Sequence, residues 1–386
     1  MKSALTTRRA ALVVALVLAL VLQPGTGAFA QEEESAGPPL AARAWALTDA
    51  ESGEYLAGEN GEERLPMAST TQIMVALVAF EVADLDEEVA VSEEAAAFAT
   101  PAYSNVGLFA GDVLSVRELL MATLVSSGDD AAYALAEHLG GEAGVEGFVE
   151  TMNRRAGALG LEDTSFENPI GFDARDHYAS ARDLAEMTRL AMNHPEFEEL
   201  VGTTYASITT QDREIPLTNT NELLFTYAPA TGVKTGTTPG AGPSLVASAA
   251  SGDESYVAVV LDDDDRFEDS MRLLDYGFAA YDRTNLVVEG DRYATASVPY
   301  RRDATVGLVA EENVAGLVDR RSRLERRIRM IEEMPASAEP GTRLGEVVVE
   351  VEGKKVGESA LVAARGYDEA SIGERVWYTA SGVWRD

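Results

Sequence analysis

The pattern of apolar and polar positions divides the chain near residue 284 into two regions of different secondary structure. Before that point, β-hairpins are expected at residues 44–56, around a Glu-Ser-Gly turn, and at residues 245–261, around a Ser-Gly-Asp-Glu turn. Apolar residues at helical spacing or in continuous runs predict several helices in the same region. The predicted helices are residues 69–82, 115–126, 130–139, 144–159, 181–194 and 268–281.

After residue 284 the pattern changes to short strands separated by glycine, proline and charged turns. The predicted strands are residues 286–288, 293–298, 305–309 and 344–351, and the last of them folds back at residues 352–353. We therefore expect one domain at residues 43–283 and a C-terminal β-rich domain at residues 284–386. Residues 31–42 are acidic and contain proline, and they predict a disordered leader.

Residues 1–30 have the three parts of a secretion signal peptide. A charged start with two adjacent arginines precedes an apolar run at residues 10–22, and Ala-Phe-Ala follows as a small-x-small cleavage site. The apolar run is too short to span a bilayer comfortably. Both the general and the twin-arginine export routes are compatible with this start. The sequence predicts a mature chain that begins near Gln31 and works outside the cytoplasm, on the cell-envelope side of the membrane or in the extracellular space.

Composition excludes several classes of function. The chain has 65 acidic and 31 basic residues, a formal net charge of −34, so we expect no non-specific binding to nucleic acid. It has no cysteine, which excludes thiol catalysis, disulfides and cysteine-ligated metal. The three histidines, His138, His177 and His194, are too scattered to predict a zinc site. We interpret the acidic excess as a contribution to solubility.

Lysine is rare in this chain, and one lysine lies in a glycine-rich run. Of the 31 cations only four are lysines, namely Lys2, Lys234, Lys354 and Lys355. Lys234 lies in the run Gly-Val-Lys-Thr-Gly-Thr, where glycines let the backbone approach a ligand closely. An ammonium is a compact charge whose pKa shifts on burial, unlike the wide guanidinium of arginine. Lys234 is therefore a candidate anion-binding residue, and the alternative is a surface lysine in a glycine-rich turn.

Three short motifs carry the candidate chemistry. Ser-Thr-Thr-Gln at residues 69–72 opens an apolar helix, Ser-Gly-Asp at residues 127–129 lies between two helices, and Lys-Thr-Gly at residues 234–236 leads into an apolar strand. Each motif is weak alone, but their order and separations resemble the SxxK, SxN and KTG motifs of the serine DD-peptidases. The chain is identified as a member of the low-molecular-weight penicillin-binding proteins, and specifically it resembles the D-alanyl-D-alanine carboxypeptidases.

The resemblance covers nearly all of the predicted mature chain. The further stretches that carry it are residues 67–71, 130–132, 168–171, 177–178, 181–184, 246–249, 345–347 and 361–364. Gly128 favours the peptidases over the related β-lactamases, which usually have Asp at that place. The resemblance implies the α/β fold shared by penicillin-binding proteins and β-lactamases, an antiparallel sheet flanked by helices, followed by a small all-β sandwich.

The resemblance also implies a mechanism that needs no metal or organic cofactor. Ser69 is the implied nucleophile, which attacks the D-Ala-D-Ala amide of a peptidoglycan pentapeptide stem, or a β-lactam, and forms an acyl-enzyme. The backbone N–H groups of Ser69 and Thr237 form the implied oxyanion hole, and Ser127 relays a proton to the leaving amine. A cation and a hydroxyl at a strand edge suit the free carboxylate of the peptide. The implied substrate-binding residues are Lys234, Thr235, Gly236, Thr237 and Asp129.

Two residues depart from the family pattern. Gln72 stands where the family has the lysine of SxxK, the usual general base, and an amide accepts no proton at any working pH. General-base catalysis contributes about 10²–10⁴-fold, so its loss is large. Asp129 stands where the family has Asn. It could pair with Lys234 and weaken binding of the substrate carboxylate, or it could replace the base by working through Ser127.

These departures leave three functions to compare. The first is the carboxypeptidase, with activity impaired by Gln72. The second is a catalytically weak or inactive pseudoenzyme that binds cell-wall peptide or a protein partner. The third, ranked lowest, is a β-lactam hydrolase, which needs a deacylating base. Glu167, beside Asn168-Pro169, is a coincidental candidate for that base.

Other features have simpler interpretations. We interpret His177 as a hydrogen-bonded structural residue. The six arginines at residues 320–329 are expected on a solvated strand edge, and the alternative is a surface for anionic lipid or wall polymer. The aromatic residues at 377–384 stand among acidic residues and a glycine. We therefore expect membrane contact to be weak or absent.

Overall fold

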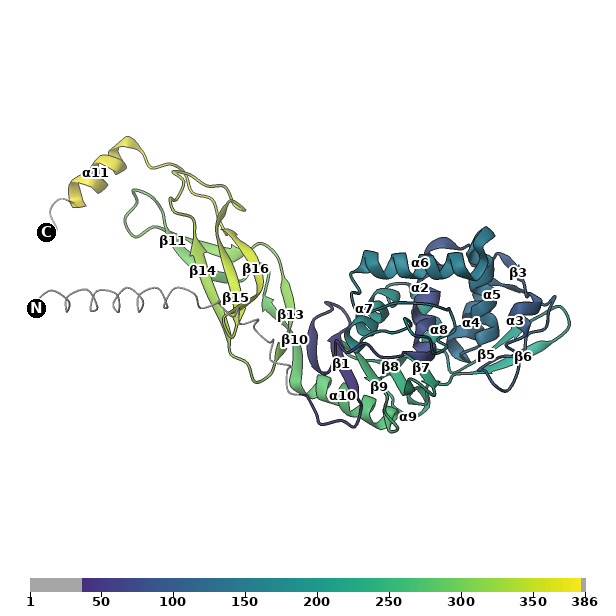
Figure 1. The fold of residues 1–386 in the computed structure, drawn as a ribbon. Helices are drawn as coiled ribbons and strands as arrows, with labels where there is room; N and C mark the ends of the chain where they lie inside the picture. The colour runs from purple at the N-terminus through teal and green to yellow at the C-terminus, as the bar shows by residue number, and fades with distance from the viewer. Residues whose placement is uncertain (1–36, 383–386) are drawn as a thin grey trace, which may run out of the picture. The chain divides into compact units, whose positions relative to one another are not determined.

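The computed structural model describes residues 37–382 of the protein (Figure 1). The predicted signal peptide at residues 1–30 and half of the predicted leader at residues 31–42 lie outside the described residues. The described part contains an α/β region with two hydrophobic cores and a β-rich region with its own core.

A five-stranded antiparallel sheet lies at the centre of the α/β region. Its order is β2-β1-β9-β8-β7, so β7 forms one edge. The strands are β1 (Ala44–Asp49), β2 (Tyr55–Glu59), β7 (Ala230–Thr238), β8 (Gly242–Ser251) and β9 (Glu254–Leu261). The hairpins β1–β2 and β8–β9 are the two that the sequence predicts.

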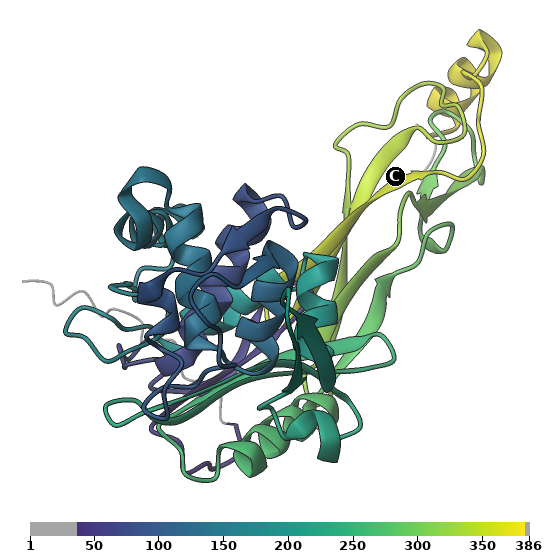
Figure 2. The ribbon, with the colours of Figure 1, turned by 90° about the vertical axis from the view of Figure 1, so that its right-hand side faces the viewer.

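Both faces of this sheet are covered, which explains why its strands are apolar without alternation. In β1, Ala44 and Ala46 pack into one core while Trp45 and Leu47 pack into the other. Successive side chains of a strand point to opposite faces, so apolar residues are needed at every position when both faces are buried. In Figure 2 most helices lie above the sheet, and α10 (Arg266–Ala280) lies below it.

The helices of the first face belong to one core, and their limits agree closely with the predicted ones, except that the sequence pattern does not predict α8. They are η1 (Ala68–Thr71), α2 (Gln72–Val82), α4 (Val116–Val125), α5 (Asp129–Leu139), α6 (Gly144–Leu159), α7 (Ala181–Ala191) and α8 (Pro195–Gly202). Residues 72–79 of α2 are all buried, which explains why this helix is apolar all round. Ser115 and Glu118 form a capping box that fixes the start of α4.

Several short elements have too few residues for a periodic signal, and the sequence analysis did not predict them. They are β3 (Glu88–Ala90), α3 (Glu93–Ala96), β4 (Val113–Ser115), η2 (Gly141–Ala143), β5 (Tyr205–Thr209), β6 (Glu214–Thr218) and α9 (Leu223–Thr226). The pairs β3–β4 and β5–β6 form small two-stranded sheets.

The β-rich region has a two-stranded sheet, β10-β13, and a five-stranded sheet, β11-β12-β16-β15-β14. Its elements are β10 (Tyr281–Val287), β11 (Arg292–Ser297), β12 (Thr305–Ala310), β13 (Val314–Asp319), β14 (Leu324–Met330), β15 (Arg343–Val351), β16 (Lys354–Ala363) and α11 (Ile372–Gly382). Leu286 of the small sheet shares a core with Leu308 and Val347 of the larger one. The predicted fold class, a helix-flanked antiparallel sheet followed by an all-β domain, is confirmed.

The arginine-rich run at residues 320–329 leads into β14, an edge strand, in agreement with the prediction. Arg327 pairs with Glu350 at 3.1 Å and Arg329 pairs with Glu346 at 3.4 Å. The run is thus balanced by carboxylates of the adjacent strand. Within residues 37–382, no helix has both the length and the apolar character needed to cross a bilayer.

Gly171 allows a loop to touch the turn that carries Ser69. Its φ is +87°, and a Cβ at this position would lie 2.0 Å from the carbonyl oxygen of Ala68. Asn168 fixes the loop, because its side-chain oxygen accepts the N–H of Gly171 at 2.8 Å. Both the backbone conformation and the close approach therefore require glycine.

We expect Gly171→Ala to be less stable than the matched variant Gly160→Ala. Gly160 also has a positive φ, +74°, but a Cβ there would meet nothing within 4 Å. The left-handed backbone conformation should lower the free energy of unfolding of both variants by about 1–2 kcal/mol. The overlap with Ala68 should cost Gly171→Ala about 1–3 kcal/mol more. Urea unfolding measures both losses, and equal losses would show that the contact with Ala68 relaxes freely.

Candidate active site

Residues from three separate parts of the sequence meet at one buried site. Ser69 lies in the 3₁₀ turn η1 and Gln72 begins α2, so the two share one helical face. Ser127 lies in the turn before α5 with a φ of +57°, and Lys234 lies in β7. Lys234 is 1% exposed, whereas Ser69 is 9% exposed. The candidate nucleophile therefore keeps some access to solvent, while the lysine lies beneath the surface.

A chain of side-chain hydrogen bonds joins the three motifs. Lys234 Nζ donates to Ser127 Oγ at 2.7 Å, and Ser127 Oγ donates to Gln72 Oε1 at 3.3 Å. Gln72 Nε2 in turn donates to Asp129 Oδ1 at 3.1 Å. Lys234 Nζ also donates to the carbonyl of Thr235 at 3.0 Å. The Gln72 amide thus lies between the serine hydroxyl and the carboxylate, with its oxygen toward one and its nitrogen toward the other.

Strand β7 lies with its free edge against the turn that carries Ser69. Within the described sheet β7 pairs only with β8. A Cβ added at Gly236 would lie 3.0 Å from Met67 O and 3.1 Å from Ser69 N, which explains the glycine of the Lys-Thr-Gly run. A free strand edge can pair with an extended peptide. A peptide bound at this edge would run past Ser69.

Three threonines and an arginine lie along the same edge. Thr235 Oγ1 and Thr220 Oγ1 share a hydrogen bond of 2.6 Å. Arg266 Nη1, from the first residue of α10, donates to Thr237 Oγ1 at 2.8 Å. With Lys234, the edge therefore combines two cations with hydroxyl groups, a combination that suits a ligand carboxylate.

Burial brings the pKa values of two charged groups in the site close together. Burial raises the pKa of Asp129 to about 7, and the nearby Lys234 opposes this shift. Burial lowers the pKa of Lys234 to about 7, with Asp129 opposing the shift and Arg266 adding to it. Each group can therefore change its charge near neutral pH.

His177 supports the first turn of the nucleophile helix as a neutral side chain. Its Nδ1 accepts the backbone N–H of Glu167 at 3.0 Å, so the ring proton is on Nε2, 2.9 Å from Thr71 Oγ1. Thr71 Oγ1 donates to the carbonyl of Ala68 at 2.8 Å. Burial lowers the pKa of His177 to about 4. These contacts favour the structural interpretation of His177.

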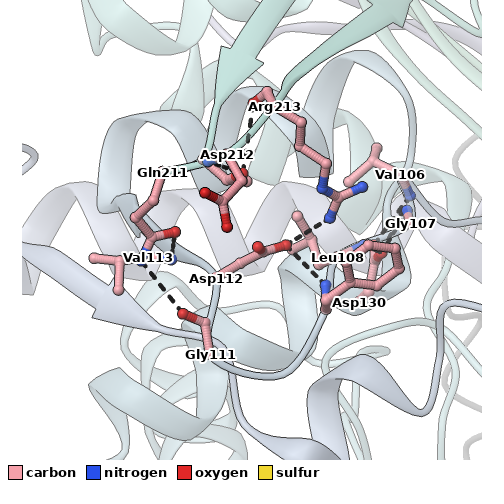
Figure 3. Close-up of polar contacts among 12 residues, drawn as sticks. Val106, Gly107, Leu108, Gly111, Asp112, Val113, Asp130, Gln211, Asp212 and Arg213 are labelled. Atoms are coloured by element: carbon pink, nitrogen blue, oxygen red, sulfur yellow. Dashed lines mark hydrogen bonds and ion pairs between the residues drawn. The ribbon is translucent and has the colours of Figure 1, made fainter.

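The loop at residues 104–113 is held against the start of α5 by a buried carboxylate. Asp130 accepts the N–H groups of residues 106–108 at 3.2, 2.9 and 2.9 Å (Figure 3). From the β5–β6 hairpin, Arg213 pairs with Asp112 of the same loop at 2.6 Å. The carbonyl of Ser104 accepts the N–H of Asp129 at 2.8 Å. The loop is thus fixed beside the Ser-Gly-Asp motif.

The contacts of Asp129 differ from both alternatives that the sequence raised. Among the described ion pairs none joins Asp129 to Lys234, and the Asp129 carboxylate bonds to Gln72 rather than to Ser127. The physical reason is that an amide carries both a donor and an acceptor. Gln72 therefore binds Asp129 and Ser127 at once and separates them.

Sequence reasoning missed Thr220 and Arg266, which complete the edge of the site. Thr220 lies in a polar run, Thr-Asn-Thr-Asn, and Arg266 follows four consecutive aspartates. The polar run is a usable signal for a functional loop. Arg266 gives no such signal, because its role depends on α10 starting beside β7.

A serine at a helix start, packed against an edge strand that carries Lys-Thr-Gly, defines the class of serine peptidases that bind penicillin. Residues 30–265 match the family model for D-alanyl-D-alanine carboxypeptidase. Residues 281–369 match the model for the C-terminal domain of penicillin-binding protein 5. The chain therefore belongs to the D-alanyl-D-alanine carboxypeptidase family of low-molecular-weight penicillin-binding proteins, and the resemblance seen in the sequence is confirmed.

Individual relatives agree with this assignment. The chain is 30% identical to the D-alanyl-D-alanine carboxypeptidase DacF of Bacillus subtilis, over 92% of this chain and 94% of the relative. It is 33% identical to DacC of Escherichia coli, over 91% and 90%. The structure is similar to that of penicillin-binding protein 5 from Haemophilus influenzae, with a TM-score of 0.67 and 28% identity over 86% of this chain and 99% of the other.

We expect His177 to make the native state sensitive to acid. Its folded pKa of about 4 lies below the ordinary value of 6.5, so the unfolded state binds more protons between these values. Stability is therefore lost as the pH falls from 6.5 toward 4, by up to about 3 kcal/mol. In His177→Gln this contribution should be absent.

Urea unfolding at pH 7.5 and pH 4.5 gives the loss of unfolding free energy on acidification, which is compared between the wild type and His177→Gln. The matched control is His138→Gln. His177→Gln should lose about 2–3 kcal/mol less than the wild type on acidification. Equal losses of stability in the wild type and His177→Gln would contradict a lowered pKa of His177 in the folded protein.

Proposed function

We propose that the protein is a serine-type D-alanyl-D-alanine carboxypeptidase that trims peptidoglycan stem peptides through an acyl-enzyme on Ser69. The observation that carries this proposal is the contact between the Ser69 turn and the free edge of β7 at Gly236. It brings a helix-start hydroxyl beside a strand edge that can bind an extended peptide. The names of the relatives, D-alanyl-D-alanine carboxypeptidases, support the same reaction.

Each motif has a distinct task in this proposal. The backbone N–H groups of Ser69 and Thr237 stabilise the oxyanion, since both belong to segments packed together at Gly236. Lys234 and Thr235 bind the terminal carboxylate of the peptide, and Arg266 adds positive charge at the same edge. Ser127 passes a proton to the leaving amine. The signal peptide predicted from the sequence supports a reaction outside the cytoplasm.

A second function is favoured by Gln72. The amide at this position accepts no proton, and it is fully buried between Ser127 and Asp129. A protein with this pocket but without an effective base would bind stem peptides or β-lactams and release them unchanged. We therefore keep a wall-peptide-binding pseudoenzyme as the alternative.

We expect a labelled penicillin to acylate Ser69 and no other residue. Ser69 is the hydroxyl that lies both at a helix start and against the β7 edge. Intact mass should show one adduct, and peptide mapping should place it on Ser69. The adduct should be absent in Ser69→Ala. An adduct elsewhere, or one that survives this substitution, would remove Ser69 from the mechanism.

We expect Gln72→Lys to accelerate acylation by about 10²-fold or more, because it restores a base one helical turn after Ser69. Rates of labelling by a fluorescent penicillin separate the two functions. Slow labelling of the wild type and fast labelling of Gln72→Lys would support the impaired enzyme. An unlabelled wild type with a labelled variant would support the pseudoenzyme. If neither protein is labelled, both the impaired enzyme and the pseudoenzyme are contradicted.

A further inference from the structure

We propose that Lys234, acting through Ser127, accepts the proton of Ser69 and so replaces the base that is missing at position 72. This inference rests on the proposed function and extends it. It gives Lys234 a task beyond binding the substrate carboxylate. The geometry that points to it is the 2.7 Å contact between Lys234 Nζ and Ser127 Oγ.

The other titratable groups near the nucleophile are already engaged elsewhere. Asp129 bonds to Gln72, and among the hydrogen bonds of the described residues none joins it to the side chain of Ser127. His177 uses Nδ1 for the N–H of Glu167 and Nε2 for Thr71. Gln72 itself accepts no proton. Lys234 is therefore the basic group in direct contact with Ser127, whose hydroxyl is bonded to Gln72, one helical turn after the nucleophile.

The hydrogen-bonding partners of Lys234 suit an amine as well as an ammonium. An ammonium has three N–H donors, and the described residues offer two acceptors, Ser127 Oγ and the carbonyl of Thr235. An uncharged amine has two donors and one lone pair. The rotatable hydroxyl of Ser127 can then donate to that lone pair without movement of the heavy atoms. The site can thus hold Lys234 in the form that a base requires.

The charges around Lys234 are few, and they act in opposite directions. Asp129 of α5 raises its pKa, while burial and Arg266 of α10 lower it, and the result is about 7. Asp130 acts on Asp129, and Glu222 acts on Arg266. Strand β8 and the turn η1 carry no charged residue. Two further groups of carboxylates lie on segments packed against β7. Asp173 bonds to Thr238 at the end of the strand, and α8 carries Glu196, Glu198 and Glu199.

The proposed step balances without a further reactant. Ser69 Oγ forms a bond to the carbonyl carbon of the scissile amide while its proton passes to Ser127 Oγ. The Ser127 proton passes at the same time to the lone pair of Lys234 Nζ. When the carbon–nitrogen bond breaks, the proton on Nζ returns through Ser127 to the leaving amine. The products are the ester of Ser69 and the free terminal D-alanine.

Single-turnover acylation by a fluorescent penicillin tests this base between pH 5.5 and pH 9. The measurement separates the acylation rate constant at saturation from the dissociation constant of the initial complex. In the wild type the rate constant should rise about tenfold per pH unit below pH 7 and level off above it, since a base works only when unprotonated. In Lys234→Arg it should fall about 10²-fold or more and lose this rise. The dissociation constant should change much less, because arginine keeps the positive charge.

Two further variants sharpen the result. Asp129→Asn removes the carboxylate whose charge raises the pKa of Lys234, so the rise in the rate constant should move to lower pH. Lys354→Arg, at an exposed lysine of the C-terminal region, is the matched control and should behave as the wild type.

Several outcomes would overturn the proposal. If Asp129→Asn abolishes acylation at every pH, Asp129 is the base. If Lys234→Arg keeps the wild-type pH dependence, or if the wild type acylates at a rate that does not depend on pH, Lys234 is not the base although the proposed function stands. If neither the wild type nor Gln72→Lys is acylated, the proposed function fails, and the base assignment fails with it.

Discussion

The burial of Lys234 without a carboxylate in direct contact is the constraint on which the site depends. An isolated buried ammonium is costly, so its hydrogen bonds must be well made. They come from Ser127 at 2.7 Å and from the carbonyl of Thr235 at 3.0 Å. Ser127 reaches this place only because its turn adopts a φ of +57° before α5. These hydrogen bonds fix the relative positions of strand β7, the α4–α5 turn and the start of α2.

The residues at positions 72 and 129 change the charge of the site while keeping its connections. The resemblance implies an ammonium at the first position and an amide at the second, whereas this chain has an amide and a carboxylate. A hydrogen bond of 3.1 Å joins the two side chains. The three positions 72, 129 and 234 then carry one negative and one positive formal charge. An incoming carboxylate is attracted less strongly by such a site, and Arg266 at the β7 edge supplies additional positive charge.

Much of the fold follows from the sequence because the strong signals are local. The unbroken apolar runs of β8 and β9 and the apolar helix α2 predict elements that are buried on all sides. The short hairpin β5–β6 could not be predicted, since its few residues give no periodic pattern. The motifs predicted that Ser127 and Lys234 lie near the helix start that carries Ser69, and hydrogen bonds join both residues to Gln72 of that helix. The position of Asp129 relative to Lys234 could not be predicted, because it depends on how the Gln72 amide is oriented between distant segments.

The most direct test of this account is the pKa of Lys234, and the rarity of lysine makes it accessible. Labelling with [ε-¹³C]lysine gives one signal for each of the three lysines of the predicted mature chain, and Lys354 and Lys355 are exposed. Lys234→Arg identifies the signal of Lys234 by its loss. The account predicts that this signal titrates near pH 7, while the exposed lysines titrate near their ordinary value of about 10.4. Titration of the Lys234 signal above pH 10 would contradict the account.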